Sequence, residues 1–430
     1  MLKSFWNHCS PFTERYIFYG WWIAIGSMAI LTMTSGIGFF GHTLILDPLR
    51  MEFGWSKGTV SSAVTLFFLV GAVAGSIIGG QIDKYGSSPV LVFGSFCLGL
   101  GFILLARIQN LWELYAVYFI LAIGWSGAHA VPVSSLIARW FVRKRGLAMS
   151  VAMTGLSLGG VIVVPVASYL LERFGLRGAL PLYGFALWAV IIPIALFLLK
   201  SSPAVMGIYT DGDLPPSHDK EGPETTPGIS SQMTSWTRRQ AMSTKAFWAI
   251  VLAFFLVFSG QITFMIHEIS FLSPFLGSTG AAFAVSLMTG SSFCGRLIVG
   301  SFVDRLNLRG VAVICFLLQA GAVLTIAHCS RSVPLYFCVV AFGLTMGNII
   351  MIQSLLIGEC FGMISFGSVS GLVMLFTSSG SAFGPMLAGI LFDITKSYRP
   401  VFSLFALSYT LASGVVIFAN PPQRTQATQR

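Results

Sequence analysis

The chain has 430 residues, of which 55% are hydrophobic and only 9% are charged, and its mean hydropathy is +0.82. Soluble globular proteins carry roughly 25% charged residues, so this composition excludes a soluble domain and predicts a polytopic membrane protein. The net charge of +10 comes from basic residues scattered in short loops between apolar runs. Such a distribution encodes membrane topology rather than nucleic-acid binding.

Apolar runs long enough to cross a bilayer, which requires about 20 residues, recur along the whole chain. Twelve are predicted, at 18–41, 59–82, 89–107, 112–138, 146–171, 178–199, 246–268, 279–303, 309–328, 333–358, 366–392 and 400–419. The first lacks a small-residue cleavage site and is predicted to be retained as a span. The predicted fold is therefore an all-α membrane protein of twelve transmembrane helices.

The chain divides into two six-helix bundles, predicted at 1–200 and 245–430, joined by a linker at 201–244. This linker holds five prolines among Gly, Ser, Asp and Glu and cannot bury a core of its own. Lys and Arg favour the cytoplasmic side of a membrane. Sixteen of the 25 lie on the side of the two termini, eight lie on the other side, and Arg296 falls inside a span. We therefore expect both termini to be cytoplasmic, in the cell (inner) membrane.

The two halves repeat each other. A shift of 220 residues brings Leu136, Phe141 and Pro165 onto Leu356, Phe361 and Pro385, and a shift of 221 brings Asp83 onto Asp304. Halves with equal span number and the same orientation are related by an axis along the membrane normal. The sequence therefore predicts a parallel internal repeat of the kind found in one large class of secondary transporters.

One loop motif occurs in both halves, as GGQIDKYG at 79–86 and as GSFVDR at 300–305. It resembles the G-x-x-x-D-[RK]-x-G loop of the major facilitator superfamily, although Ser88 stands where that pattern often has a basic residue. The resemblance implies that the glycines allow close helix packing. It also implies that the aspartates engage helix N-termini and nearby arginines to hold the outward-facing state. The gating residues implied are Gly79, Asp83, Arg143, Arg145, Gly300, Asp304 and Arg305.

Dispersed segments resemble one branch of that superfamily more closely. These are YGWW at 19–22, RWFVRKRGLA at 139–148, His267, and GRLIVGSFVDR at 295–305. They are similar to the monocarboxylate transporter branch and its bacterial oxalate/formate relatives, over about two thirds of the chain. The eleventh span contains no Lys or Arg, whereas a dicarboxylate exchanger would be expected to offer a second cation there.

Arg296 is a permanent charge placed near the bilayer interior, where it requires an anionic partner or a polar cavity. No acidic residue lies within a turn of it on its own helix. A substrate carboxylate would satisfy the guanidinium through two parallel hydrogen bonds, and the resemblance implies the same role. The alternative is that Arg296 pairs with backbone carbonyls at the broken end of another helix. The acidic residue that relatives carry one turn earlier is Ser292 here.

Other polar residues inside the spans are candidate ligands or proton carriers. We predict that His42, His129 and Asn348 contact the substrate and that His267 and Glu268 couple a proton. The resemblance places His42 where relatives carry a lysine, and histidine changes its charge near physiological pH. The alternatives are that the histidines are packing residues and that Asn348 joins neighbouring helices. Adjacent helical residues point about 100° apart, so His267 and Glu268 need not share a face.

We therefore predict a secondary active transporter that moves a small organic anion, with a monocarboxylate as the expected substrate, together with a proton by alternating access. Alternatives are an organic-anion exchanger, an efflux carrier of the same superfamily, or a transporter-like nutrient sensor. No enzyme is expected, since no HExxH, Walker loop or Cys/His cluster is present. No cofactor or metal is expected beyond the coupling proton. The expected partners are the anion and the lipid bilayer, without nucleic acid, and a monomer is compatible with this interpretation.

Overall fold

The computed structural model describes residues 18–55, 57–212 and 236–422, and this part of the chain is helical with short connections. Eleven helices in it are long and apolar enough to span a membrane. One of them, at 145–198, reverses at Gly175, whose φ of 66° and ψ of 179° are not helical. It therefore supplies two spans, and the predicted twelve-helix membrane fold is confirmed. The middle of the predicted linker, at 213–235, lies outside the described residues.

The N-terminal half contains spans one to six. Its elements are α2 (Tyr19–Met33), the π-helical η1 (Thr34–Phe39), α3 (Gly41–Phe53), α4 (Lys57–Tyr85), α5 (Ser87–Leu105), α6 (Leu111–Ala128), α7 (Ala130–Trp140), α8 (Arg145–Leu158), the π-helical η2 (Gly159–Val163), α9 (Val164–Pro193) and η3 (Ile194–Leu198). Two short 3-10 turns follow, η4 (Pro203–Met206) and η5 (Thr210–Gly212).

The C-terminal half contains spans seven to twelve. Its elements are the short α10 (Arg238–Met242), α11 (Lys245–Phe302), the 3-10 turn η7 (Val303–Arg305), α12 (Leu308–His328), α13 (Ser332–Met346), α14 (Ile349–Phe361), α15 (Phe366–Thr395) and α16 (Tyr398–Val416). Helix α11 supplies two spans, because Gly277 interrupts it with a φ of 72°, a left-handed conformation that glycine adopts without steric cost.

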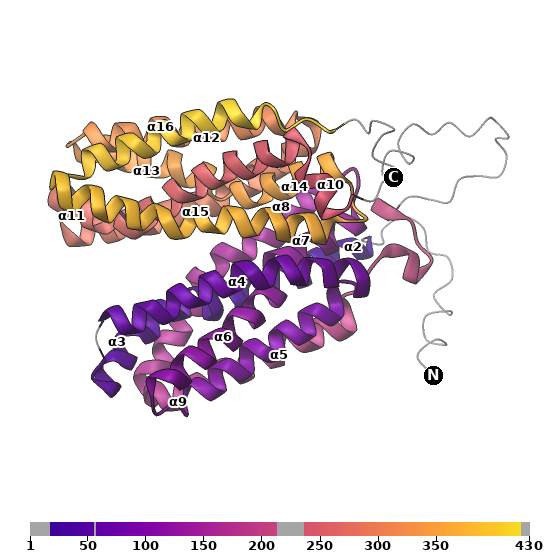
Figure 1. The fold of residues 1–430 in the computed structure, drawn as a ribbon, viewed down its shortest axis with the longest axis horizontal. Coiled ribbons are helices and arrows are strands. Elements are labelled where there is room, and N and C mark those ends of the chain that lie inside the picture. The colour runs from indigo at the N-terminus through magenta and orange to yellow at the C-terminus, as the bar shows by residue number, and fades with distance from the viewer. Residues whose placement is uncertain (1–17, 56, 213–235, 423–430) are drawn as a thin grey trace.

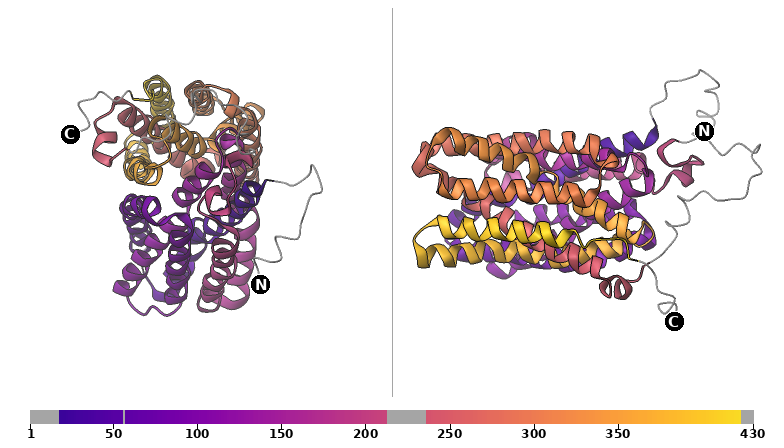
Figure 2. Two further views of the ribbon diagram at one scale, coloured as in Figure 1. Left: turned by 90° about the vertical axis from the view of Figure 1, so that its right-hand side faces the viewer. Right: turned by 90° about the horizontal axis from the view of Figure 1, so that it is seen from above.

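The halves form two helical bundles that lie side by side (Figure 1). Figure 2 (left) looks along the helices and shows one bundle above the other. Between the bundles, α4 packs along α15 and α8 packs along α11. The first described helix begins and the last ends on the same side of the molecule, which we call the terminal face; the loops at 84–87, 141–145 and 361–366 also lie there. The other side is the opposite face.

The internal repeat is visible in a direct contact. The hydroxyls of Ser134 in α7 and Ser354 in α14 are 3.3 Å apart, and these residues are separated by 220 positions, the spacing of the repeat. Residues equivalent under a two-fold operation meet each other at its axis. Spans four and ten therefore face each other across the interface between the halves.

Candidate transport site and gate

Spans four and ten are both interrupted near their middles. Helix α6 ends at Ala128, and His129, with φ −109° and ψ −139°, separates it from α7. Helix α13 ends at Met346, and Gly347 and Asn348 separate it from α14. Breaks in membrane helices release backbone carbonyls and are found where they line a polar site. Positions 129 and 348 lie 219 residues apart, within one residue of the repeat spacing, so the two breaks occur at nearly equivalent places in the two halves.

Arg296 lies beside the second break and reaches both halves. It is 4% exposed. Its Nε donates to the carbonyl of Gly347 at 2.8 Å, and its Nη1 donates to the carbonyl of Met153 in α8 at 2.6 Å and to the Ser157 hydroxyl at 3.3 Å. These three acceptors are neutral, and no carboxylate forms an ion pair with Arg296 among the described residues. The arginine thus meets backbone carbonyls at a broken helix while its charge stays uncompensated.

Polar atoms without partners surround the same break. Three buried atoms there make no hydrogen bond within the described part of the chain: the Oγ of Ser292, the Oδ1 of Asn348 and the Oε1 of Gln261. The Nδ2 of Asn348 donates to the carbonyl of Leu344 in the last turn of α13 at 2.8 Å. Buried polar atoms are nearly always paired, so such a cluster indicates a place where a ligand or water binds.

His129 occupies the break in span four. Its ring stacks on Trp125 with centroids 4.5 Å apart, and its Nδ1 lies 3.3 Å from the hydroxyl of Thr34. It also lines a small cavity that extends to Met374 of α15, in the other half. His129 is therefore buried at the interface between the halves, and its contact with the substrate stays a prediction.

His42 lies apart from this site. It is 3% exposed at the start of α3, and its ring packs edge-on against Phe67, with centroids 4.3 Å apart, and beside Tyr118 at 5.3 Å. Both ring nitrogens and the Tyr118 hydroxyl are without a hydrogen-bond partner among the described residues. The groups to which Arg296 donates do not include His42 among the described residues, so the structure does not bring His42 to Arg296.

His267 and Glu268 point to different surroundings on α11. The Nδ1 of His267 lies 3.2 Å from the hydroxyl of Tyr398 in α16. Glu268 is fully buried, and neither of its carboxylate oxygens has a partner in the described part of the chain. A buried carboxylate without a partner is far more stable when it carries a proton. The two residues thus do not form a joint pair, and Glu268 has the surroundings of a protonated acid.

Two equivalent hydrogen-bonded contacts, one from each half, join the halves at the terminal face. The carboxylate of Asp304 accepts from the backbone N–H groups of Gly146, at 2.5 Å, and Leu147, at 3.1 Å, in the first turn of α8. Asp83 accepts likewise from Gly367 at 2.9 Å and Ser368 at 2.7 Å in the first turn of α15. Each aspartate therefore satisfies free donors at the positive end of a helix in the opposite half.

Glycines allow these aspartates to come close. A Cβ added to Gly79 would lie 2.0 Å from the carbonyl oxygen of Gly367, and a Cβ on Gly300 would lie 2.1 Å from the Cβ of Ser150. Backbones in membrane bundles approach closely where small residues face each other. Arg238 adds a third contact, because its guanidinium donates across the interface to the carbonyl of Ser76 in α4.

The arginines predicted at the gate take different places. The Nη2 of Arg139, which was not predicted, lies 3.8 Å from Asp83. Arg145 is attracted electrostatically by Asp304 and by Asp211 of the linker. The backbone N–H of Arg143 donates to Asp211 at 2.8 Å. Arg305 is exposed on η7.

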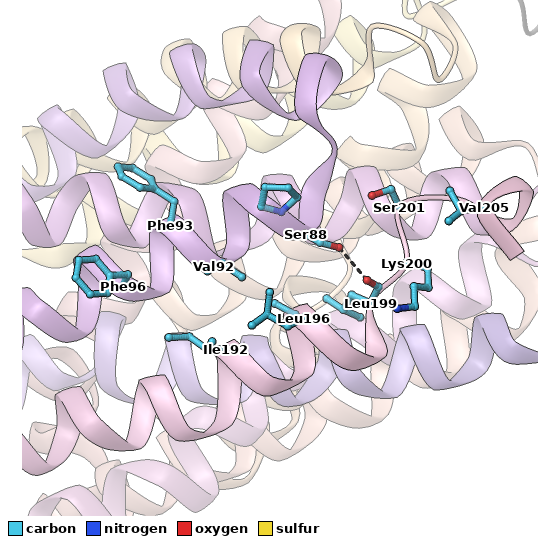
Figure 3. A pocket seen from close by; sticks show the side chains of 12 residues that line it. Ser88, Val92, Phe93, Phe96, Ile192, Leu196, Leu199, Lys200, Ser201 and Val205 are labelled. Atoms are coloured by element: carbon cyan, nitrogen blue, oxygen red, sulfur yellow. Dashed lines mark hydrogen bonds between the residues drawn. The ribbon is translucent and has the colours of Figure 1, made fainter. Parts of the chain in front are cut away.

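An apolar groove on the outer wall of the N-terminal half lies apart from these residues (Figure 3). It runs between the start of α5 and the end of η3 and is lined by Phe93, Phe96 and Leu196, with Lys200 near one end. Within it, the Ser88 hydroxyl donates to the carbonyl of Leu199 at 3.0 Å. None of its lining residues bonds to Arg296, so the groove is separate from the candidate transport site.

Comparison with known proteins agrees with this architecture. The profile of the Major Facilitator Superfamily matches residues 28–362 and 271–430. The chain belongs to the major facilitator superfamily. Monocarboxylate transporter 11 of Homo sapiens is 28% identical over 424 residues, covering 94% of this chain and 83% of that protein. Monocarboxylate transporter 12 of Rattus norvegicus is 24% identical over 440 residues, covering 96% and 87%.

Among solved structures, the E. coli fucose:proton symporter FucP superposes with a TM-score of 0.70 at 15% identity, covering 94% of this chain and 98% of that one. This likeness concerns the fold alone. The chain is thus a multi-pass membrane transporter of the major facilitator superfamily, related to the monocarboxylate transporters.

Several contacts of the candidate site and gate could not be predicted from the sequence. The acceptors of Arg296 include the backbone carbonyls of Gly347 and Met153, which any residue type would supply. Gln261 is one amide in a span and was not predicted. Asp211 is one acid in a polar linker. Only the glycine at 347, followed by an asparagine inside an apolar run, is a sequence signal for the break.

Proposed function

We propose that this transporter moves a small organic anion, with a monocarboxylate as its substrate, together with a proton by alternating access. The observation that carries the proposal is Arg296, a buried guanidinium whose partners are all neutral. A buried charge without a countercharge is costly. A carboxylate beside Arg296 would compensate that cost and gain charge-assisted hydrogen bonds at the same time. The relationship to the monocarboxylate transporters supports the same class of substrate.

The substrate site would be completed by the polar atoms at the two helix breaks. Asn348 would offer its Oδ1 beside Arg296, and His129 would contribute from the equivalent break in the N-terminal half. His42 stays a prediction, since it is packed among aromatic rings at the start of α3. In this arrangement both halves hold the anion, so its binding can influence how they move.

Glu268 is the proposed proton carrier. Its burial without a partner favours the neutral acid while the halves are arranged as described. A proton on Glu268 and an anion on Arg296 together leave the site near neutrality, which lowers the cost of moving both through the membrane. His267 would tune this site through its contact with Tyr398.

The two aspartate contacts support alternating access. We propose that the terminal face is cytoplasmic, as the excess of basic residues on that side favours. The halves would then be held together at their cytoplasmic side by Asp83 and Asp304, and the described arrangement would be outward-facing. Asp83, Asp304 and the glycines beside them would form the gate that opens when the halves rock.

Uptake into proteoliposomes tests the proposal. A panel of labelled monocarboxylates, dicarboxylates, neutral solutes and organic cations is offered with and without an inward proton gradient. Wild type is compared with Arg296→Lys, which keeps the charge but loses the planar fork. The matched control is Arg177→Lys, on a partly exposed ion pair with Glu52.

Gradient-driven uptake of a monocarboxylate that is lost in Arg296→Lys and kept in Arg177→Lys is the expected result. Uptake of cations or neutral solutes with no carboxylate moved would overturn the anion proposal and leave Arg296 structural. Carboxylate uptake that requires an anion inside the vesicles and does not respond to the proton gradient would show exchange and contradict proton symport.

A further inference from the structure

The segment between η3 and α10, residues 199–237, joins the two halves and contacts the gate at both of its described ends. At its start, Asp211 in η5 contacts the loop before α8. At its end, Trp236 contacts the loop before α15. Helices α8 and α15 are the two whose first turns are held by aspartates of the opposite half.

Asp211 binds three successive backbone N–H groups. Its Oδ2 accepts from Val142 at 3.0 Å and from Arg143 at 2.8 Å, and its Oδ1 lies 3.4 Å from the nitrogen of Lys144. Consecutive N–H groups that converge on one carboxylate form an anion-binding concavity. Asp211 has a φ of 57°, a left-handed conformation that is costly for a residue other than glycine. The surrounding contacts must therefore stabilise this arrangement.

Two carboxylates from different parts of the chain thus hold five of the six backbone N–H groups of residues 142–147. Asp211 holds 142–144, and Asp304 of the C-terminal half holds Gly146 and Leu147. Arg145 lies between them and is attracted by both, which offsets the repulsion between the two acids. The N-cap residue of α8, Lys144, makes no capping hydrogen bond through its side chain. The first turn of α8 therefore depends on Asp304 for capping and on Asp211 for the shape of the loop that presents it.

The loop before α15 also contacts both the joining segment and an aspartate of the opposite half. Ser365 is the N-cap residue of α15, where a serine hydroxyl would ordinarily accept from the helix's own N–H groups. Here its hydroxyl accepts from the backbone N–H of Trp236 at 3.1 Å. The N–H groups of Gly367 and Ser368 are left to Asp83 of the N-terminal half. Trp236 is 7% exposed and packs edge-on against Phe361 at 5.7 Å, which fixes this end of the segment.

We propose that Asp211 and Ser365, with its partner Trp236, are positioning residues of the gate, through which the joining segment sets the stability of the closed terminal face. Asp211 shapes the loop so that Gly146 and Leu147 can meet Asp304. Ser365 is bound by the segment, which holds the loop before α15 where Asp83 can cap the first turn of α15. Loss of either contact destabilises the closed terminal face and favours its opening. The inference rests on the alternating-access part of the proposed function and not on the substrate.

The test measures the position of the halves directly. Spin-labelled noncanonical residues are placed at 107 and 331, which are exposed loop positions on the opposite face of the two halves, so the native cysteines stay in place. The distance distribution between the labels in the full chain, in lipid nanodiscs, gives the ratio of the two conformations. The variants are Asp211→Asn, Asp304→Ala and the double variant. Glu172→Gln, which neutralises an exposed acid, is the matched control.

If Asp211 acts through the aspartate contact, Asp211→Asn should raise the ratio of terminal-face-open to closed molecules by about threefold, the scale of removing a negative charge near a helix N-terminus. It should have no further effect once Asp304→Ala is present, because the contact it supports is already gone. An equal shift in both backgrounds, or no shift beyond that of Glu172→Gln, would overturn the proposal.

Ser365→Ala with and without Asp83→Ala repeats the cycle at the other loop. It keeps the proposal testable if Asp211→Asn does not fold. Ser365→Ala should raise the open population when Asp83 is unchanged, and this effect should vanish when Asp83→Ala is also present. Because the readout needs no substrate, failure of this experiment is separate from failure of the carboxylate assay.

Discussion

A single methyl group added at Gly79 should open the gate. Gly79 lies on α4 where it crosses α15, and a Cβ built there would be 2.0 Å from the carbonyl oxygen of Gly367 and 3.4 Å from the Cα of Gly371. Carbon and oxygen atoms that are not bonded prefer separations above 3 Å. In Gly79→Ala the two helices must therefore separate by more than an ångström at the terminal face.

The cost of this separation falls on the closed state. Inserting a methyl group into a packed contact typically costs about 1–3 kcal/mol. The same displacement lengthens the bonds from Gly367 and Ser368 to Asp83, which measure 2.9 and 2.7 Å. In the open state the halves are apart and the methyl group meets nothing. The equilibrium should therefore shift toward the open terminal face by about 5- to 150-fold.

The distance between labels at 107 and 331 measures this shift. Gly75→Ala is the control, because Gly75 precedes Gly79 by one turn on α4 and a Cβ there meets no atom within 4 Å. It makes the same change in helix propensity without the contact. Equal distance distributions for the two variants would refute the close-approach argument.

Three further changes have expected outcomes. Asp304→Ala should shift the same equilibrium by about 0.5–2 kcal/mol, the cost of a lost helix cap, measured from the label distances. A shift that matches Glu172→Gln would contradict the capping role. Glu268→Gln should fold with a melting temperature close to that of the wild type, because the buried acid is already neutral. It should lose gradient-driven uptake while exchange continues, and unchanged gradient dependence would exclude Glu268 as the proton carrier. Trp140→Phe should lower unfolding free energy by about 0.5–1.5 kcal/mol, since it removes the 2.7 Å bond to the Lys200 carbonyl, and denaturant titration would show whether that bond contributes.

The sequence alone determined the membrane class, the number of spans and the division into similar halves. Hydropathy is a local property, since about 20 apolar residues in a row must cross the bilayer wherever they occur. The repeated loop motif also located Asp83 and Asp304, because two copies at equivalent positions are hard to produce by chance. It did not reveal that each aspartate caps a helix of the opposite half, since that contact joins residues 157 or more positions apart.

Tertiary structure decided what surrounds the polar residues in the spans. The sequence marks Arg296 as exceptional, but its acceptors are carbonyls of Gly347 and Met153, and carbonyls are present at every residue. Likewise, nothing in the composition of a polar linker distinguishes Asp211 from its neighbours; only the folded loop at 142–144 directs three N–H groups toward it. Backbone groups leave no trace in the amino-acid sequence, so the partners they provide become known only when distant segments are brought together.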